Sequence, residues 1–181
     1  MENIFKKKGE VETHNVFKWE NLGNIKEGRG DLGEDMPVMV YRLLQFTMLD
    51  VLTKKYGSDK ANDLFREAGF LAGTELATHV LDLCVDMDSF VANFEKALTE
   101  LKIGIMRMEV FDPTSGNVIL TMSQDLDCSG LPITDETVCC YDEGFISGVL
   151  HVYTGKHYDV KEIDCWASGD RSCRFSGVVL D

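Results

Sequence analysis

The chain has 181 residues, of which 44% are hydrophobic and 27% are charged. This composition is typical of one soluble globular domain, because disordered chains contain fewer apolar residues and membrane proteins contain more. The 18 basic residues are outnumbered by 31 acidic ones, which leaves a net charge of −13. Phosphate backbones and anionic lipid surfaces repel such a chain. We therefore expect neither nucleic acid nor a membrane as a partner.

The cysteine content and the N-terminus both predict a cytoplasmic protein. Six cysteines are too few for a disulfide scaffold in a chain of this length. The basic segment Lys6-Lys7-Lys8 is not followed by the apolar stretch of a secretory signal. In a reducing compartment, cysteines are metal ligands, reactive thiols or small core residues.

Residues 1–30 form a polar, glycine-rich lead-in, in which the alternation over residues 16–25 suggests a hairpin. We expect residues 31–181 to form a single domain that begins with three helices. Apolar residues recur at helical spacing over 37–56, 58–80 and 88–101, with Pro37 suited to a first turn and Gly57 to a stop. In the second of these helices, Gly69 and Gly73 have the spacing that lets another backbone approach closely.

After Gly104 the apolar pattern changes from a helical period towards alternation. It predicts strands over residues 105–110 and 118–122, a loop over 125–136 and a fourth helix over 138–153. Two further strands are expected at 157–165 and 173–180, joined by a tight turn. This order of elements predicts an α+β fold, with a helical half packed on an antiparallel sheet.

The last two predicted strands carry residues with metal-binding chemistry. Cys165 and Cys173 flank the turn between these strands, so their side chains can converge, and Cys139 begins the preceding helix. Glu162 lies three residues before Cys165, and only a bulge or bend would aim both inward. Such ligands would complete a tetrahedral zinc site, since thiolates favour zinc over hard cations. The alternative is that the cysteines are buried core residues, and spacing alone leaves both interpretations open.

Three segments carry a family resemblance: Glu162-x-x-Cys165-Trp166-Ala167-x-Gly169-Asp170-x-x-Cys173-Arg174-Phe175, Val138-Cys139-x-x-x-x-Gly144-Phe145-x-Ser147-Gly148, and Gly33-Glu34-x-Met36-Pro37 followed by Tyr41-Arg42. Together they resemble the 4-vinyl-reductase-type domain family, and the resemblance covers about residues 30–180. This family is related to the sensory domains of phenol- and xylene-responsive regulators and to small subunits of the TRAPP vesicle-tethering complex.

The resemblance implies a structural zinc ion that pins the C-terminal hairpin to the preceding helix. Its implied ligands are Cys139, Glu162, Cys165 and Cys173. Such a set fills a tetrahedral shell and leaves no position for a catalytic water. The remaining cysteines are then expected to be ordinary residues: Cys84, Cys128 and Cys140.

The resemblance also implies a function. We expect a stand-alone sensory or binding module that holds a small apolar, aromatic or lipid-like molecule between its helices and its sheet. Related domains are dimeric, so a homodimer is expected. The chain has no ATPase or DNA-binding region, and we therefore expect a separate output protein.

Two alternative functions follow from the same resemblance. One is reduction of a tetrapyrrole vinyl group, or an accessory role in it, although the sequence contains neither a dinucleotide-binding fingerprint nor an iron–sulfur cysteine series. We therefore expect no catalysis. The other is an interaction scaffold, which would need an exposed apolar patch.

Two further patterns have a structural and a functional interpretation. The segment Asp125-x-Asp127-x-Ser129-Gly130 with Glu136 has calcium-loop spacing, but Pro132 and Ile133 interrupt it, so we favour an ordinary loop. Methionine and phenylalanine side chains could line an adaptable cavity, although core packing is their commoner role. They are Met36, Met39, Met48, Met106, Met108, Met122, Phe46, Phe65, Phe70, Phe94 and Phe111.

Overall fold

The computed structural model describes residues 17–112 and 114–180, which separate into two units between Glu34 and Asp35. In the described part of the first unit the chain forms a 3-10 helix, Trp19–Leu22, and one helical turn, α1 (Ile25–Gly28). The sequence predicted a hairpin here. Helical turns form instead because the Asn24 side chain caps α1 by accepting the Glu27 N–H at 3.1 Å. Residue 16 of the predicted hairpin lies outside the described residues.

Four longer helices form in the second unit close to their predicted positions. They are α2 (Val38–Tyr56), α3 (Ser58–Val80), α4 (Met87–Glu100) and α5 (Cys140–Thr154). Gly57 separates α2 from α3 with a φ of 84°, a backbone conformation that favours glycine. Asp86 caps α4 by accepting the Ser89 N–H at 3.0 Å, so this helix begins slightly earlier than predicted.

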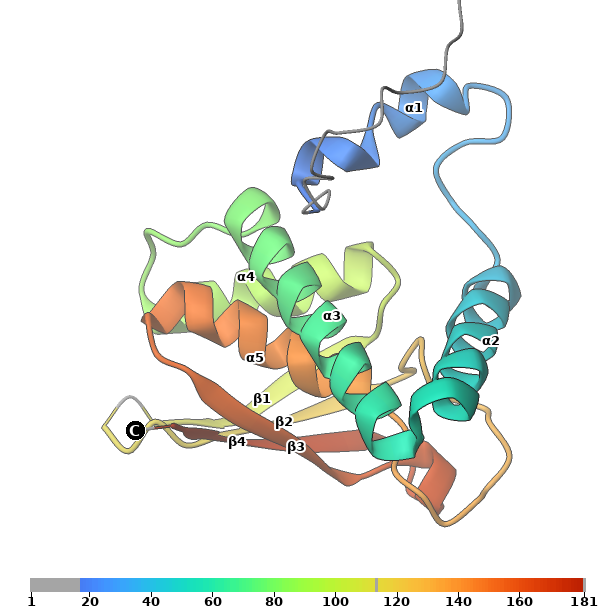
Figure 1. Cartoon of the computed structure of the whole chain (residues 1–181). Coiled ribbons are helices and arrows are strands. Elements are labelled where there is room, and N and C mark those ends of the chain that lie inside the picture. The colour runs from blue at the N-terminus through green and yellow to red at the C-terminus, as the bar shows by residue number, and fades with distance from the viewer. Residues whose placement is uncertain (1–16, 113, 181) are drawn as a thin grey trace, which may run out of the picture. The chain divides into compact units, whose positions relative to one another are not determined.

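The four strands form one antiparallel sheet. They are β1 (Ile105–Phe111), β2 (Val118–Ser123), β3 (Tyr158–Asp164) and β4 (Cys173–Val179), in the spatial order β1-β2-β4-β3. The C-terminal hairpin therefore joins the first hairpin through β4. Helices α3, α4 and α5 lie over one face of this sheet (Figure 1), which confirms the predicted α+β fold with a helical half on an antiparallel sheet.

Buried aromatic and aliphatic side chains fill the space between the helices and the sheet. Phe90 stacks on Tyr153 with a centroid separation of 3.7 Å. Alternate residues of β2 and β4 point into the same core. The largest fully buried side chains are Phe90, Phe94, Phe175, Leu98, Leu120, Ile146, Leu150, Val118 and Val149. Among the described residues, no helix is both long and apolar enough to cross a membrane.

Glycines on both α3 and α5 bring these two helices into backbone contact. A Cβ atom on Gly144 of α5 would overlap the Arg66 carbonyl oxygen of α3, and one on Gly69 would overlap the Tyr141 carbonyl of α5. Gly73 and Gly148 make the same kind of contact further along the helices. The close approach predicted from the first glycine pair is therefore confirmed, and its partner is α5.

Gly144→Ala should lower the free energy of unfolding by about 2 kcal/mol, because the added methyl group would push the two helices apart. In an exposed helix the same change would be stabilising. Chemical denaturation measures the difference. Gly28→Ala is the control, since a Cβ there meets nothing within 4 Å. Equal stability of the Gly144→Ala variant and the wild type would contradict the close packing.

Candidate metal centre

Four cysteine side chains from four parts of the chain meet in one buried cluster. Cys139 caps the start of α5, Cys165 follows β3, Cys173 begins β4, and Cys128 lies in the loop between β2 and α5. Their sulfur atoms all lie within 4.8 Å of one another, and each residue is at most 1% exposed. The Sγ of Cys139 is 4.0 Å from that of Cys165 and 3.8 Å from that of Cys173. We call these four residues the sulfur cluster.

Three members of the sulfur cluster are ligands implied by the resemblance, whereas Cys128 was expected to be an ordinary residue. Its Sγ lies 3.0 Å from that of Cys173. Cys128 reaches this position because Asp125 Oδ1 accepts the N–H groups of Asp127 and Cys128, at 2.7 and 3.3 Å, and so turns the loop inward. The sequence signal for this turn is the Asp125-x-Asp127 spacing, which also suggested a calcium loop.

Glu162 lies beside the sulfur cluster with its carboxylate only half used. Oε2 accepts the N–H groups of Val138 and Cys139 at 3.1 and 3.0 Å. Oε1 is buried and has no hydrogen-bond partner among the described residues. Burial raises the pKa of Glu162 to about 8, and the thiols of Cys139 and Cys165 lie close enough to contribute. The strand register shifts between Glu162 and Asp164, so β3 contains the bulge that lets Glu162 and Cys165 both face inward.

Glu143 holds Glu162 from the helical side. Its Oε1 accepts the backbone N–H of Glu162 at 2.9 Å, and its Oε2 pairs with Arg66 of α3. Lys161 approaches the same oxygen at 3.9 Å. The start of α5 and the end of β3 are thus joined by two glutamates that point in opposite directions.

The sulfur cluster cannot carry four negative charges without a cation. The pKa of Cys165 is lowered because the thiols of Cys128, Cys139 and Cys173 hydrogen-bond to its thiolate. The pKa values of Cys139 and Cys173 are raised by the same sulfur contacts. One thiolate shared among three thiols is the arrangement expected without metal, and a bound divalent cation would deprotonate the other three.

Three buried aspartates lie close to the sulfur cluster. Asp127 accepts the Tyr41 hydroxyl at 2.8 Å and the Gln45 amide at 2.7 Å, and so is anchored to α2. Asp125 and Asp142 instead each bring a carboxylate oxygen within 4.8 Å of the Cys139 sulfur and of each other. Burial raises the pKa of Asp125, to about 7, and that of Asp142.

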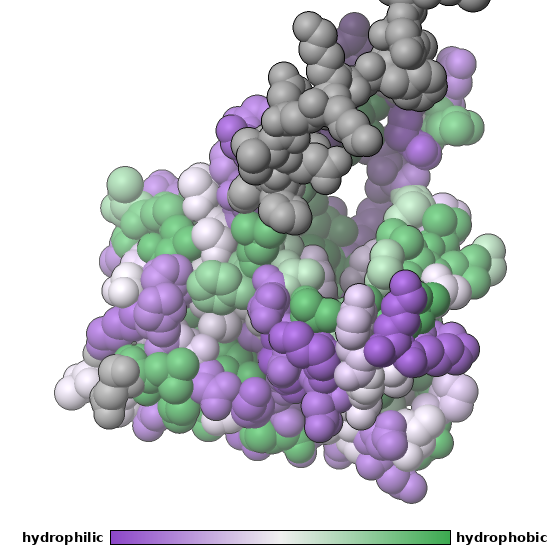
Figure 2. Space-filling model, in the orientation of Figure 1, coloured by the Kyte–Doolittle hydropathy of each residue, from purple (hydrophilic) through white to green (hydrophobic). Residues whose placement is uncertain are grey.

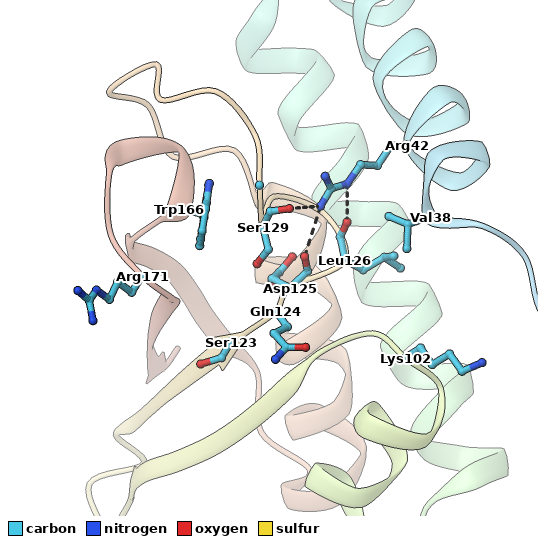
Figure 3. Close-up of a pocket in the computed structure, with 11 residues that line it drawn as sticks. Val38, Arg42, Lys102, Ser123, Gln124, Asp125, Leu126, Ser129, Trp166 and Arg171 are labelled. Atoms are coloured by element: carbon cyan, nitrogen blue, oxygen red, sulfur yellow. Dashed lines mark hydrogen bonds between the residues drawn. The ribbon is translucent and has the colours of Figure 1, made fainter.

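Arg42 of α2 fastens the loop that carries Asp125 and Cys128. Its guanidinium donates to the carbonyl oxygens of Leu126 at 2.8 Å and Ser129 at 2.9 Å (Figure 3). These contacts use a charged donor to satisfy backbone acceptors of an irregular segment. The loop lacks regular structure, so this side chain does what a strand ladder would do elsewhere.

A pocket of about 470 Å³ opens beside this loop (Figure 3). Its apolar lining comes from Val38, Leu126 and Trp166, and its basic residues are Arg42, Lys102 and Arg171. The candidate cavity residues named from the sequence do not gather here. Met106, Met122 and Phe94 are core residues, while Met36, Met39 and Met48 are exposed.

The remaining cysteines lie outside the sulfur cluster. Cys84 is exposed, and Cys140, although buried, directs its sulfur towards the Asn62 amide oxygen at 3.8 Å. The calcium-loop spacing does not produce a calcium site: Asp125 and Asp127 bond to their own loop and to α2, and Glu136 is exposed.

Comparison with known proteins agrees with this geometry. The family model of the 4-vinyl-reductase domain matches residues 118–178, which span β2, the loop of Cys128, α5 and both C-terminal strands. Two uncharacterised proteins of Methanocaldococcus jannaschii are similar along most of their length. One is 25% identical over 162 residues, 90% of this chain and 87% of the relative. The other is 27% identical over 154 residues, 83% of each.

Solved structures share the fold. The phenol-responsive sensory domain of the transcription activator PoxR, solved with phenol, superimposes with a TM-score of 0.62 at 16% identity, covering 80% of this chain and 75% of that one. A vinyl-4-reductase family protein from Methanocaldococcus jannaschii gives 0.58 at 15%, covering 83% and 85%. Trafficking protein particle complex subunit 3 from Naegleria fowleri, covalently bound to palmitic acid, gives 0.58 at 12%, covering 80% and 98%. The fold is thus that of small ligand-binding α+β domains. The chain carries a 4-vinyl-reductase-type domain, and the resemblance seen in the sequence is confirmed.

Arg42→Ala should lower the free energy of unfolding by about 2 kcal/mol, because it leaves the carbonyl groups of Leu126 and Ser129 without their charged donor. Hydrogen exchange should quicken over residues 125–131 in particular. Lys102→Ala is the matched control, since Lys102 pairs with an exposed carboxylate, that of Asp35. Unchanged exchange in this loop would show that Arg42 does not fasten it.

Proposed function

We propose that this protein is a small-molecule binding or sensory module of the 4-vinyl-reductase type, in which a structural zinc ion joins the start of α5 to the β3–β4 hairpin. The observation that carries the proposal is the buried sulfur cluster, together with the unpartnered carboxylate oxygen of Glu162. Buried groups of this kind rarely remain without a partner in a native protein. A zinc ion would satisfy all of them.

The spacing of the donor atoms fits zinc. Two sulfurs bound at about 2.3 Å to a tetrahedral zinc lie about 3.8 Å apart. The sulfur of Cys139 lies 4.0 Å from that of Cys165 and 3.8 Å from that of Cys173. Glu162 Oε1 supplies the fourth donor, so the ligands we propose are those implied by the resemblance: Cys139, Glu162, Cys165 and Cys173.

Zinc in such a site would act on the fold rather than on a substrate. Four protein ligands leave no coordination position for water, so the ion would not generate a nucleophile. The proposed ion would hold Cys139 of α5 against two residues of the terminal hairpin, Cys165 and Cys173. The six cysteines are free thiols, and this agrees with a cytoplasmic location for the protein.

Cys173→Ser should remove the zinc that the wild type retains through purification, and should lower the Tm by about 10 °C. Removing one thiolate opens the shell and leaves the other buried ligands without their cation. Elemental analysis and calorimetry measure the two effects. Cys84→Ser is the control, because Cys84 is exposed and lies outside the sulfur cluster. Full retention of both zinc and Tm in Cys173→Ser would refute the zinc site.

For the small molecule, we propose the pocket beside the loop of Cys128 rather than the space between the helices and the sheet. The latter is filled by side chains such as Phe90, Phe94 and Leu98, each less than 2% exposed. The former offers about 470 Å³, with the indole of Trp166 and the side chains of Val38 and Leu126 as apolar walls. An aromatic ligand suits a pocket of this size and lining.

An exposed apolar stripe on α2 supports the homodimer. Val40, Leu44, Met48 and Val51 recur every three or four residues, so they lie on one helix face, and each is at least 44% exposed. Figure 2 shows apolar surface gathered over α2, at the right of the view. A stripe of this kind is self-complementary across a two-fold axis, and we propose a second copy of the chain as its occupant. The same stripe favours the interaction scaffold as the second candidate function.

Native mass spectrometry of gently purified protein tests binding and dimer formation together. We expect a dimer that carries extra mass, and that releases an aromatic or lipid-like molecule on denaturation. Leu44→Glu should give a monomer, because it places a charge in the apolar stripe, while Lys54→Glu should stay dimeric. A dimer without extra mass would favour the scaffold, and an empty monomer would contradict both functions.

A further inference from the structure

Three buried side chains next to the proposed zinc are not used by it. They are Cys128, Asp125 and Asp142. The Cys139 sulfur belongs to two close groups of donor atoms, one formed with the other three cysteines and one formed with the two aspartates. The proposed zinc would therefore lie on one side of this sulfur, and the two carboxylates would lie on another.

The carboxylate of Asp142 has an oxygen without a partner among the described residues. Asp142 is 8% exposed, and its Oδ2 receives no hydrogen bond from them. An aspartate at this third position of a helix ordinarily accepts a backbone N–H of the first turn. Here Glu162 already accepts the N–H of Cys139, so Asp142 points instead into the group that contains Asp125 and the Cys139 sulfur.

Within the described part of the chain, the contacts that hold the loop bring no positive side chain to these carboxylates. Arg42 directs its guanidinium to backbone carbonyl oxygens rather than to Asp125 or Asp142. Asp125 uses Oδ1 for the N–H groups of Asp127 and Cys128. Buried carboxylates that face each other and a thiolate are stable only when they bind protons or a cation.

We infer that Asp125, Asp142 and Cys128 bind a second divalent transition-metal ion, with the thiolate of Cys139 bridging it to the proposed zinc. This inference rests on the proposed function. Two four-coordinate ions that share one ligand need about seven donors, and the four cysteines, Glu162, Asp125 and Asp142 supply that number. The second ion removes two units of the negative charge that one zinc leaves uncompensated.

The donor set selects the class of ion. Two carboxylates and two thiolates suit a borderline cation such as Zn²⁺, whereas Ca²⁺ and Mg²⁺ require mostly oxygen ligands. Cys128 lies between the two groups: its sulfur is 3.0 Å from that of Cys173, and its backbone N–H donates to Asp125. The short sulfur–sulfur separation is tighter than one tetrahedral ion requires, which fits Cys128 turning towards a separate ion.

Metal counting on zinc-reconstituted full-length protein tests this inference. We expect about two zinc ions per chain in the wild type and about one in Asp142→Asn, a twofold loss. Asp127→Asn is the matched control, because this buried aspartate of the same loop is bonded to Tyr41 and Gln45. It should retain both ions. Cys128→Ser, which changes a different element, should also retain only one.

Cobalt substitution supplies a readout that does not depend on variants. Two Co²⁺ ions bridged by a thiolate should be magnetically coupled in the wild type, and the single ion of Asp142→Asn should not be. One metal per chain, uncoupled and unchanged in Asp142→Asn, would overturn the second site and leave the proposed zinc intact. The absence of bound metal in the wild type would overturn the proposed function itself. If a variant fails to fold, the count and the coupling in the wild type still decide.

Discussion

The close contact between α3 and α5 is the constraint on which the site depends. Carbonyl oxygens of Arg66 and Tyr141 occupy the space that side chains on Gly144 and Gly69 would fill, so the two helices can pack only with glycine at these positions. Because the contact involves backbone on both sides, it sets the axial position of α5 closely. Cys139, at the first turn of α5, is thereby held at one height above the sheet.

The sheet meets this fixed point through carboxylates rather than through apolar packing. Glu162 of β3 reaches up to the N–H groups at the start of α5, and Glu143 of α5 reaches down to the N–H of Glu162. Each glutamate therefore satisfies backbone donors that a helix start or a bulged strand leaves unpaired. Arg66, from the helix behind, pairs with Glu143 and links the glycine contact to the sheet.

Much of this organisation is readable from sequence because it depends on local periods. Helical spacing located α2, α3 and α5 to within a few residues, and alternation located the four strands. The order of the strands was not predicted, since β4 pairs with β2 through contacts distant in sequence. Cys128 illustrates the same limit. It enters the sulfur cluster from an irregular loop, and the contacts that direct it inward, from Asp125 and Arg42, carry no period.

The two ends of α5 are stabilised by different kinds of interaction. Towards its middle, α5 is held by van der Waals contact with α3 and by buried side chains such as Ile146 and Leu150, which do not depend on ions. At its start, the buried groups are thiols and carboxylates, whose burial is costly until a cation compensates them. Metal binding and local folding are therefore coupled at the start of α5 and uncoupled further along. Loss of the proposed ions should release the loop of Cys128 and the terminal hairpin first, because the helix pair retains every contact that holds it.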